Sequence, residues 1–209
     1  MTTQQNMPTI NVEKLHFAKL LSENTDDVTK TTYHTPKWFA GVRQIGAKPK
    51  IQATPIYGDG RLMTQLSNVS SIDVTVDVVS LNDEEEAYLL GHKIAEDGGI
   101  IYGDSDVAPT VAMIFKSPKA KGGDRYMAYY AGEFEPYDID LKQQEGKTTP
   151  TYTKLKATFR PLSNGLYKHK FDSDSPNVSQ DKIDNFFSKV YIPIPKKVNP
   201  IVENNNVNA

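Results

Sequence analysis

The 209-residue sequence predicts a mainly β protein, an antiparallel β-sandwich or barrel flanked by one short α-helix. A long loop in the N-terminal half and a C-terminal helix and arm complete the predicted fold. About seven to nine segments alternate apolar and polar residues with a period of two, as strands do. Turn residues join most of these segments as hairpins, and helix signals occur only mid-chain and near the C-terminus. These observations together favour an antiparallel sheet with a helix packed on it.

The composition limits the classes of function that the chain can perform. Hydrophobic residues make up 38% of the chain and charged residues 24%, so a sizeable share must be polar loop or tail. A net charge of −2 excludes a global basic field that would recruit nucleic acid or anionic lipid. The absence of cysteine excludes a disulfide scaffold, thiolate metal sites and a cysteine nucleophile.

We expect no secretory signal and no membrane contact. The N-terminal MTTQQNMPTI lacks both the basic region and the apolar region of a signal peptide. The longest apolar runs are far shorter than the roughly 20 residues that a membrane helix needs.

One folded domain is expected over residues 10–192, between a disordered N-terminus (1–9) and a disordered C-terminal tail (193–209). Ile10–Leu21 is predicted as the first strand. Residues 22–36 are polar and threonine-rich, with too little apolar surface to fold alone. A loop of that length in a compact domain is usually functional or disordered.

Trp38 and Phe39 end this long loop, and Trp38 is the only tryptophan of the chain. One interpretation is that Trp38 covers a sheet edge. The other is that Trp38 and Phe39 anchor a protein interface, where tryptophan is enriched.

A long hairpin follows. Val42–Ile56 is extended and of mixed polarity, the residues Tyr57-Gly58-Asp59-Gly60 form a turn, and Arg61–Gln65 returns. Because few large apolar residues lie on either face, this hairpin is hard to bury in a monomer. We expect it to project from the body or to pair with another subunit.

The most sharply specified stretch is Ser71–Lys93. Apolar residues alternate with Asp73, Thr75 and Asp77, which predicts a strand with one buried face. Asn82 is predicted to cap a helix, with Glu85 in the capping-box position and acidic residues in the first turn. Gly91 supplies the left-handed residue that ends such a helix.

Gly98–Gly103 is predicted as a short apolar strand between glycines, and Asp104-Ser105-Asp106 as a turn. Two carboxylates could bind a hard cation, but a calcium loop needs more oxygen ligands, so we predict no metal site. Pro109–Pro118 and Asp124–Tyr137 form the clearest predicted hairpin. The turn between them, Lys119–Gly123, is expected to be basic and solvated.

The remainder is predicted as two further strands, a helix and an arm. The strands are Pro150–Pro161 and Leu166–Phe171, joined by the turn at 163–165 and preceded by a polar loop at 142–149. An amphipathic helix is predicted over Val178–Lys189, capped by Asn177 or Ser179. A short extended arm, Tyr191–Pro195, follows it.

No signature of catalysis is present in the sequence. The chain has no GxSxG, HExxH or phosphate-loop motif, and its four histidines show no ligand spacing. His92 follows the predicted end of a helix, where a structural role is expected. Asp73 with Asp77, and Glu133 with Glu135, are pairs on one strand face, which are usually solvated. We therefore predict no enzyme, no cofactor and no metal.

Several segments, taken in order, resemble those of the major tail proteins, or tail tube proteins, of long-tailed non-contractile bacteriophages. The likeness covers residues 10–192. Its most specific part is Leu89-Leu90-Gly91-His92 followed about fifteen residues later by Asp106-Val107-Ala108-Pro109. The other matching segments are the loop end at Thr35-Pro36, the Tyr57–Gly60 turn, Asp104-Ser105, the aromatic strand Tyr126–Phe134 and the C-terminal Phe187-Ser188-Lys189-Val190-Tyr191.

The resemblance implies a structural virion protein. Tail tube proteins are β-sandwiches flanked by a helix, and they form hexameric rings that stack into the tube through which DNA is ejected. Such assembly would give the 42–65 hairpin a partner and the 22–36 loop a surface to order against. The implied partners are the chain itself, a tape measure, a tail terminator and a distal tail protein, with only transient, non-specific passage of DNA. The implied location is the virion tail, assembled in the host cytoplasm.

DNA must slide through such a tube without binding to it. An acidic lining would repel phosphate and avoid the lysine contacts that give salt-dependent affinity. We hypothesise that Asp59, Asp73 and Asp77 face the lumen, because Asp73 and Asp77 lie opposite the apolar face of their strand.

Two alternatives remain. The first is a carbohydrate- or receptor-binding β-sandwich module of a virion, which aromatic residues clustered in one groove would favour. Tyr126, Tyr129 and Tyr130 are instead predicted on both faces of their strand. The second is a tube subunit of a tail-derived injection device, which the sequence does not separate from a phage tail tube.

Overall fold

The computed structural model describes residues 6–139, 143 and 150–194 and confirms a mainly β, antiparallel fold. Strands account for 49% and helices for 9% of the structure. The elements, in chain order, are β1 (Glu13–Ser22), the 3₁₀-helix η1 (Val28–Lys30), β2 (Thr32–Tyr33), β3 (Lys37–Trp38), β4 (Val42–Gly58), β5 (Arg61–Val78), α1 (Asp83–Leu90), β6 (Lys93–Ile94), β7 (Ile100–Ile101), β8 (Val111–Pro118), β9 (Asp124–Glu135), β10 (Thr153–Arg160), β11 (Lys168–Asp172) and α2 (Gln180–Asp184).

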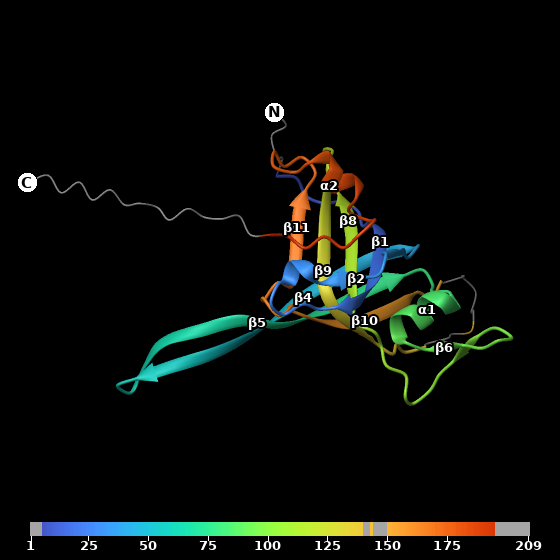
Figure 1. The fold of residues 1–209 in the computed structure, drawn as a ribbon, viewed down its shortest axis with the longest axis horizontal. Helices are drawn as coiled ribbons and strands as arrows, with labels where there is room; N and C mark the ends of the chain where they lie inside the picture. Colours follow the sequence, from blue (N-terminus) through green and yellow to red (C-terminus); the bar gives the residue numbers. More distant parts are fainter. Residues whose placement is uncertain (1–5, 140–142, 144–149, 195–209) are drawn as a thin grey trace, which may run out of the picture.

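One large antiparallel sheet has the order β2-β1-β8-β9-β10-β5-β4, with β11 added beside β9 and β3 beside β1. Strands β11, β9 and β8 stand upright in Figure 1, whereas β10, β5 and β4 cross below them. Strand β9 belongs to both parts, because its residues 125–129 pair with β11 and its residues 131–135 pair with β10. The sheet therefore changes direction along β9.

The last two strands are joined by the predicted turn but do not form a hairpin. The turn at 163–165 forms, with Gly165 at a φ of 82°. Strands β10 and β11 do not pair with each other, however, but follow one another along the same side of β9. Gly132 lies at the change of direction, where an added Cβ would come within 2.4 Å of the Phe159 ring. Only glycine, which has no side chain, therefore fits at this position.

Apolar side chains are buried on both faces of the upright strands. The larger core includes Phe17, Phe134 and Phe159 and continues under helix α1. The smaller core, on the other face, includes Tyr130 and Phe186. Because both faces are covered, β8 is buried along almost all of its length, which explains its nearly continuous apolar sequence.

The strand and helix predicted within Ser71–Lys93 are confirmed. The four apolar residues at 72, 74, 76 and 78 of β5 are at most 1% exposed. The Asn82 side chain accepts a hydrogen bond from the Glu85 N–H, and the Glu85 carboxylate accepts one from the Asn82 N–H. Gly91 ends α1 in the left-handed conformation, at a φ of 77°.

Residues 22–36 are more ordered than their composition predicts. They contain η1, which Asp27 caps by accepting a hydrogen bond from the Thr29 N–H, and β2, which pairs with β1. Val28 is buried in the smaller core, and the Tyr33 hydroxyl donates to the Tyr130 carbonyl at 3.1 Å. These few anchors fix the loop on the subunit's own sheet.

The C-terminal helix is shorter than the predicted Val178–Lys189. Helix α2 covers only Gln180–Asp184, with Ser179 as its N-cap. Beyond it, Phe186 is buried against Tyr126, with ring centroids 5.0 Å apart in an edge-to-face arrangement. The apolar spacing that predicts a longer helix thus reflects the burial of these side chains. A tight turn buries them as well as a helix would.

The turn between β8 and β9 is not the fully solvated basic turn predicted. The Lys119 side chain is completely buried, and its Nζ lies 2.6 Å from Asp174 Oδ1 and 3.2 Å from Asp172 Oδ2. Arg125 makes a two-pronged contact with the same Asp172. Burial alone would lower the pKa of Lys119, but its hydrogen bonds to these carboxylates outweigh that effect and raise it.

The two ends of the chain are described only in part. The Pro8 carbonyl accepts a hydrogen bond from the Ala120 N–H, and Thr9 forms a β-bridge with Lys119. The predicted disordered tail lies outside the described residues from 195 onward, as do nearly all residues of the predicted 142–149 loop. Among the described helices, none is long and apolar enough to cross a membrane.

Candidate assembly surfaces

The β4–β5 hairpin projects far beyond the body of the molecule (Figure 1). Its outer part, residues 51–68, is exposed along nearly its whole length, and we call it the arm. The predicted return segment is not a separate strand, because β5 runs unbroken for 18 residues from the arm into the core. The projection of this hairpin, predicted from its shortage of core residues, is confirmed.

Local sequence explains the shape of the arm. Asp59 and Gly60 both have positive φ, at 50° and 73°, which suits the tight two-residue turn between twisted strands. Pro49 and Pro55 lie in β4, the last strand of the sheet, where a missing N–H donor is tolerated. The local sequence therefore favours both strands of the hairpin, even though neither strand buries side chains in the arm.

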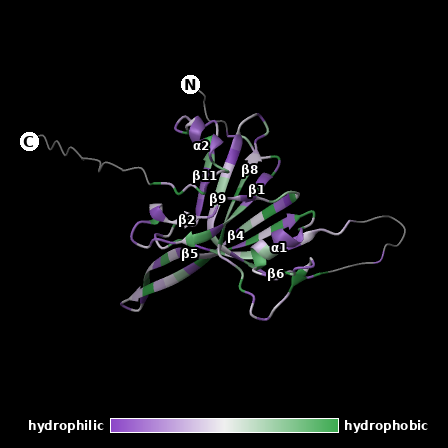
Figure 2. Cartoon of the chain, turned by 45° about the vertical axis from the view of Figure 1, so that its right-hand side comes forward, coloured by the Kyte–Doolittle hydropathy of each residue, from purple (hydrophilic) through white to green (hydrophobic). Residues whose placement is uncertain are grey.

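The arm nevertheless carries large apolar side chains, visible as green bands between white and purple in Figure 2. Apolar clusters of this kind, exposed on an extended ribbon, mark an interaction surface. The exposed apolar side chains of the arm are Ile51, Ile56, Tyr57, Leu62, Met63 and Leu66.

The two predicted interface anchors lie in different environments. Trp38 is 61% exposed on β3, opposite His16 of β1. Phe39 is 1% exposed and packs edge-to-face on Phe17, with ring centroids 4.8 Å apart. Phe39 therefore belongs to the subunit's own core, and only Trp38 is placed to contact a neighbour.

The three predicted lumen acids are not gathered in one place. Asp59 lies at the tip of the arm, roughly 40 Å along the strand from Asp73. Asp73 and Asp77 share the outer face of β5, as predicted, but lysines lie beside them. Lys50 Nζ is 2.8 Å from Asp73 Oδ1, and Lys154 of β10 is directly opposite Asp77. This face is charge-balanced rather than acidic.

The two sequence segments that carry the most specific resemblance lie against each other. His92, just after α1, donates from Nδ1 to Asp106 Oδ2 at 2.6 Å, and the Gly103 N–H donates to the same oxygen. These bonds lower the pKa of Asp106. The Val107 carbonyl passes so close to Gly91 that a Cβ there would lie 2.1 Å from it. Residues 89–92 and 106–109 thus form one structural unit.

Glu86 holds the same unit to the sheet. Its buried carboxylate accepts hydrogen bonds from the Tyr102 hydroxyl at 2.8 Å and from the Tyr137 hydroxyl at 2.7 Å. The hydrogen bond to Glu86 raises the pKa of Tyr102, and burial together with Glu86 raises that of Tyr137. One carboxylate therefore connects helix α1 with the 102–107 loop and with the residues that follow β9.

The tyrosines considered for carbohydrate binding are inside the protein. Tyr126, Tyr129 and Tyr130 are each 6% exposed or less. Tyr126 stacks on Phe171 and Tyr129 lies parallel to Phe115 within the two cores. None of the three is available to stack on a sugar ring.

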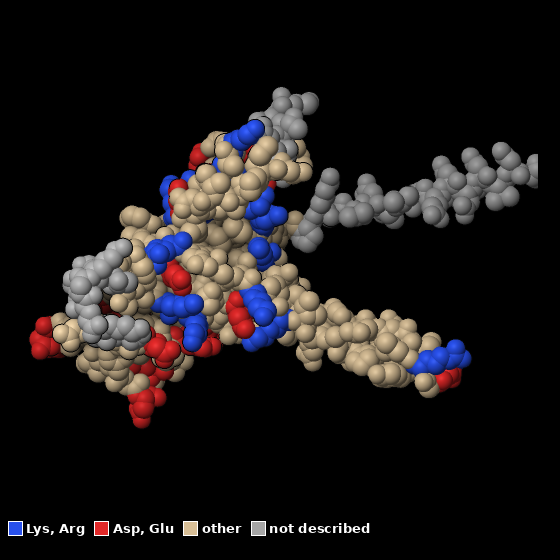
Figure 3. Space-filling view, turned by 180° about the vertical axis from the view of Figure 1, so that it is seen from behind, with Lys and Arg blue, Asp and Glu red and all other residues tan. Residues whose placement is uncertain are grey.

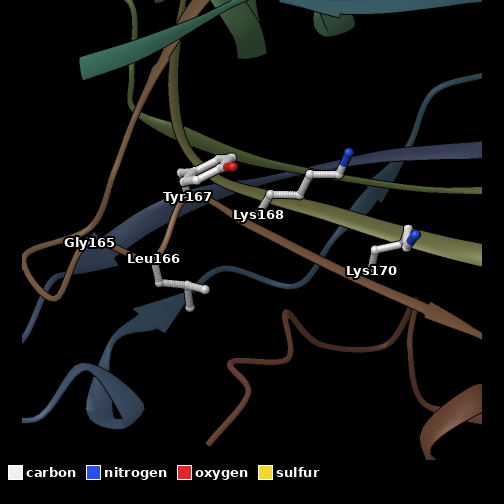
Figure 4. Close-up of a pocket in the computed structure, with 5 residues that line it drawn as sticks. All are labelled: Gly165, Leu166, Tyr167, Lys168 and Lys170. Atoms are coloured by element: carbon white, nitrogen blue, oxygen red, sulfur yellow. The ribbon is translucent and has the colours of Figure 1, made fainter. Parts of the chain in front are cut away.

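Sequence reasoning missed a small depression beside β11 (Figure 4). It has a volume of about 330 Å³ and is lined by Gly165, Leu166, Tyr167, Lys168 and Lys170. In the sequence its signal is a pair of lysines spaced by two in a short strand, which places both on one face. Among the described residues, no group of three or more His, Asp or Glu is arranged to hold a metal ion.

An antiparallel β domain with a projecting hairpin that exposes large apolar side chains is typical of the subunits of protein assemblies. The family model described as phage tail tube protein matches residues 50–191. The match covers more than half of the chain, so this protein belongs to the phage tail tube protein family. A search among curated proteins finds none that matches the sequence. Membership makes the chain a structural component of a phage tail.

Proposed function

We propose that this protein forms hexameric rings that stack into the tail tube, the conduit through which phage DNA is ejected into the host. The arm is the observation that supports this function most directly. Its six large apolar side chains are exposed in the single subunit, although their strands are well specified. Burial against neighbouring subunits would remove that apolar surface from water, at about 25 cal/mol per Å².

The partners follow from the position of such a ring in a tail. The chain itself is the main partner, through contacts that close a ring and contacts that stack one ring on the next. A tape measure, a tail terminator and a distal tail protein are proposed to contact the lumen and the two ends of the tube. Assembly is proposed to take place in the host cytoplasm, and the function requires no catalysis.

The outer face of β5 and β10 is the proposed lining of the tube. Its carboxylates, including Asp73 and Asp77, alternate with lysines across neighbouring strands. A lining of this composition presents no continuous row of lysines to phosphate, so it gives DNA no strongly salt-dependent binding site. The proposal for Asp73 and Asp77 therefore changes from an acidic lining to a charge-balanced one. Asp59, at the arm tip, is proposed to lie at a subunit contact instead.

Sedimentation of variants with a more polar arm tests this function. Replacing Ile56, Leu62 and Leu66 by serine should leave the β-sheet circular dichroism unchanged but abolish self-association, since these side chains are exposed in the subunit. The matched control replaces Ile10, Leu21 and Val79, which are exposed on the body to a similar extent, and should assemble like the wild type. A wild type that remains monomeric up to millimolar concentration would contradict the proposal.

A further inference from the structure

The depression beside β11 lies at a free strand edge. In the described sheet β11 pairs with β9 on one side only. An edge strand leaves N–H and C=O groups unpaired, and lysines on such a strand discourage indiscriminate pairing. Lys168 and Lys170 line the depression together with Leu166 and Tyr167 (Figure 4). We call this surface, residues 165–170, the lysine edge.

A region with a strongly negative net charge lies on the opposite side of the molecule (Figure 1). Residues 82–107, which comprise α1, β6, β7 and the following loop, contain eight carboxylates and one lysine, a formal charge of −7. The whole chain has a net charge of −2, so the rest of it carries +5. Figure 3 shows acidic side chains gathered at the end of the molecule that carries this region.

A two-stranded ribbon is the most prominent part of that region. Strands β6 and β7 pair only with each other in the described structure, and a turn with Glu96 and Asp97 joins them. The turn ends in Gly98 and Gly99, around which no atom lies within 4 Å of an added Cβ. Ile94 and Ile101 are about half exposed on the ribbon. We call residues 93–101 the acidic ribbon.

The lysine edge and the acidic ribbon are complementary in composition. The lysine edge has Lys168 and Lys170 beside Leu166 and Tyr167. The acidic ribbon has Glu96 and Asp97 at its turn and Ile94 and Ile101 exposed on its strands, while its one lysine, Lys93, lies at the other end, next to α1. The ribbon has free strand edges of its own, so it can add to the edge of β11 by backbone hydrogen bonds as well as by charge. In Figure 1 the two surfaces lie on opposite sides of the molecule, so one subunit cannot satisfy its own edge.

We propose that the acidic ribbon of one copy of this chain docks on the lysine edge of β11 in the next copy. Because the two surfaces differ, the contact is heterologous and repeats from subunit to subunit, as a ring or a stack requires. The inference rests on the proposed self-assembly and names one contact that produces it. The contact weakens as salt rises, because the Debye length falls from about 10 Å at 0.1 M to about 3 Å at 1 M.

Substitutions that reverse the sign of the charges on each surface test the contact. The double variant Lys168→Glu with Lys170→Glu should raise the concentration needed for assembly at least about tenfold, since it sets like charges opposite each other. Glu96→Lys with Asp97→Lys should do the same, and the two variants mixed together, or combined in one chain, should restore assembly. The control Lys121→Glu with Lys189→Glu makes the same change of net charge at two exposed lysines outside the lysine edge and should assemble normally.

Disulfide cross-linking gives an independent test of the contact. Because the chain has no native cysteine, only the introduced cysteines can react. Asp97→Cys protein mixed with Lys170→Cys protein should form disulfide-linked dimers under mild oxidation, whereas neither variant should do so alone. Linked dimers without rings or tubes would support this contact while contradicting the proposed function. Wild-type tubes without cross-linking or charge rescue would overturn the contact alone. Loss of double-stranded DNA binding in the Lys168→Glu, Lys170→Glu variant, with assembly unchanged, would also overturn it and assign these lysines to phosphate.

Discussion

His92 and Asp106 are in direct contact, although the whole β6–β7 ribbon separates them in the sequence. The 2.6 Å bond from His92 Nδ1 to Asp106 Oδ2 closes the loop that begins where α1 ends. With both side chains less than a tenth exposed, the pair fixes the base from which the β6–β7 ribbon projects. The orientation of the ribbon therefore depends on this bond together with the hydrogen bonds that Glu86 accepts from Tyr102 and Tyr137.

Replacing Asp106 by asparagine should loosen the 102–107 loop without unfolding the sheet. The pKa of Asp106 is lowered in the folded state, so its contribution to stability is present above the unfolded value of about 3.9 and is lost as pH falls through the folded pKa. Amide hydrogen exchange should show faster exchange in residues 93–107 of the variant at pH 7. Exchange rates equal to those of the wild type would contradict this role.

Gly91→Ala should be among the most destabilising single substitutions in the chain. Alanine at a φ of 77° costs about 1–2 kcal/mol, and its Cβ would also overlap the Val107 carbonyl. We expect a loss of about 3 kcal/mol or more in the free energy of unfolding, measured by urea denaturation. Gly98→Ala is the matched control, because Gly98 has a φ of 97° but open space around it, and it should lose only the conformational part.

Lys119→Met should destabilise the fold although the residue lies in a turn. Removing the buried ammonium takes away the positive charge that lies between Asp172 and Asp174. We expect a loss of about 2–4 kcal/mol in the free energy of unfolding. Lys121→Met, two residues away and exposed, should change it by less than about 0.5 kcal/mol. Similar values for both variants would show that the buried ion pairs do not stabilise this turn.

Stability should fall as the solution is acidified from pH 6.5 toward pH 4. Burial, and secondarily the nearby charge of Lys182, lower the pKa of His169 to about 4. The unfolded chain then binds the extra proton in this window, so the folded state loses stability as pH falls. Because His169 is only half buried, we expect about 1–2 kcal/mol.

A His169→Phe variant should show a shallower loss of stability over the same pH range, because phenylalanine keeps the ring but does not titrate. Burial also lowers the pKa of His16, which acts with the same sign and should persist in the variant. Thermal unfolding measured at half-unit intervals of pH separates the two contributions. An identical slope in both proteins would contradict the role given to His169.

Local signals in the sequence were sufficient for the elements that are defined locally. The alternation of β5, the Asn82–Glu85 capping box and the Gly91 helix end each depend on residues within one or two turns of chain, and all were predicted. The arm was predicted for a related reason, since a strand pair without core residues has nothing to bury.

Contacts between distant segments could not be predicted in the same way. Nothing near Lys119 in the sequence indicates that Asp172 and Asp174 lie beside it, because that depends on β11 pairing with β9. The core position of Phe39 and the lysines beside Asp73 and Asp77 likewise follow from the order of strands in the sheet. The lysine edge was missed because its two lysines acquire meaning only once β11 is an edge strand.

Electron microscopy of the purified protein tests the central claim most directly. At concentrations where the wild type associates, negative-stain images should show rings and tubes of stacked rings, and averaged end views should show sixfold symmetry. The serine-substituted arm variant should show only single subunits under the same conditions. Wild-type particles that remain single subunits, or that form rings of another symmetry, would contradict the hexameric tail tube proposed here.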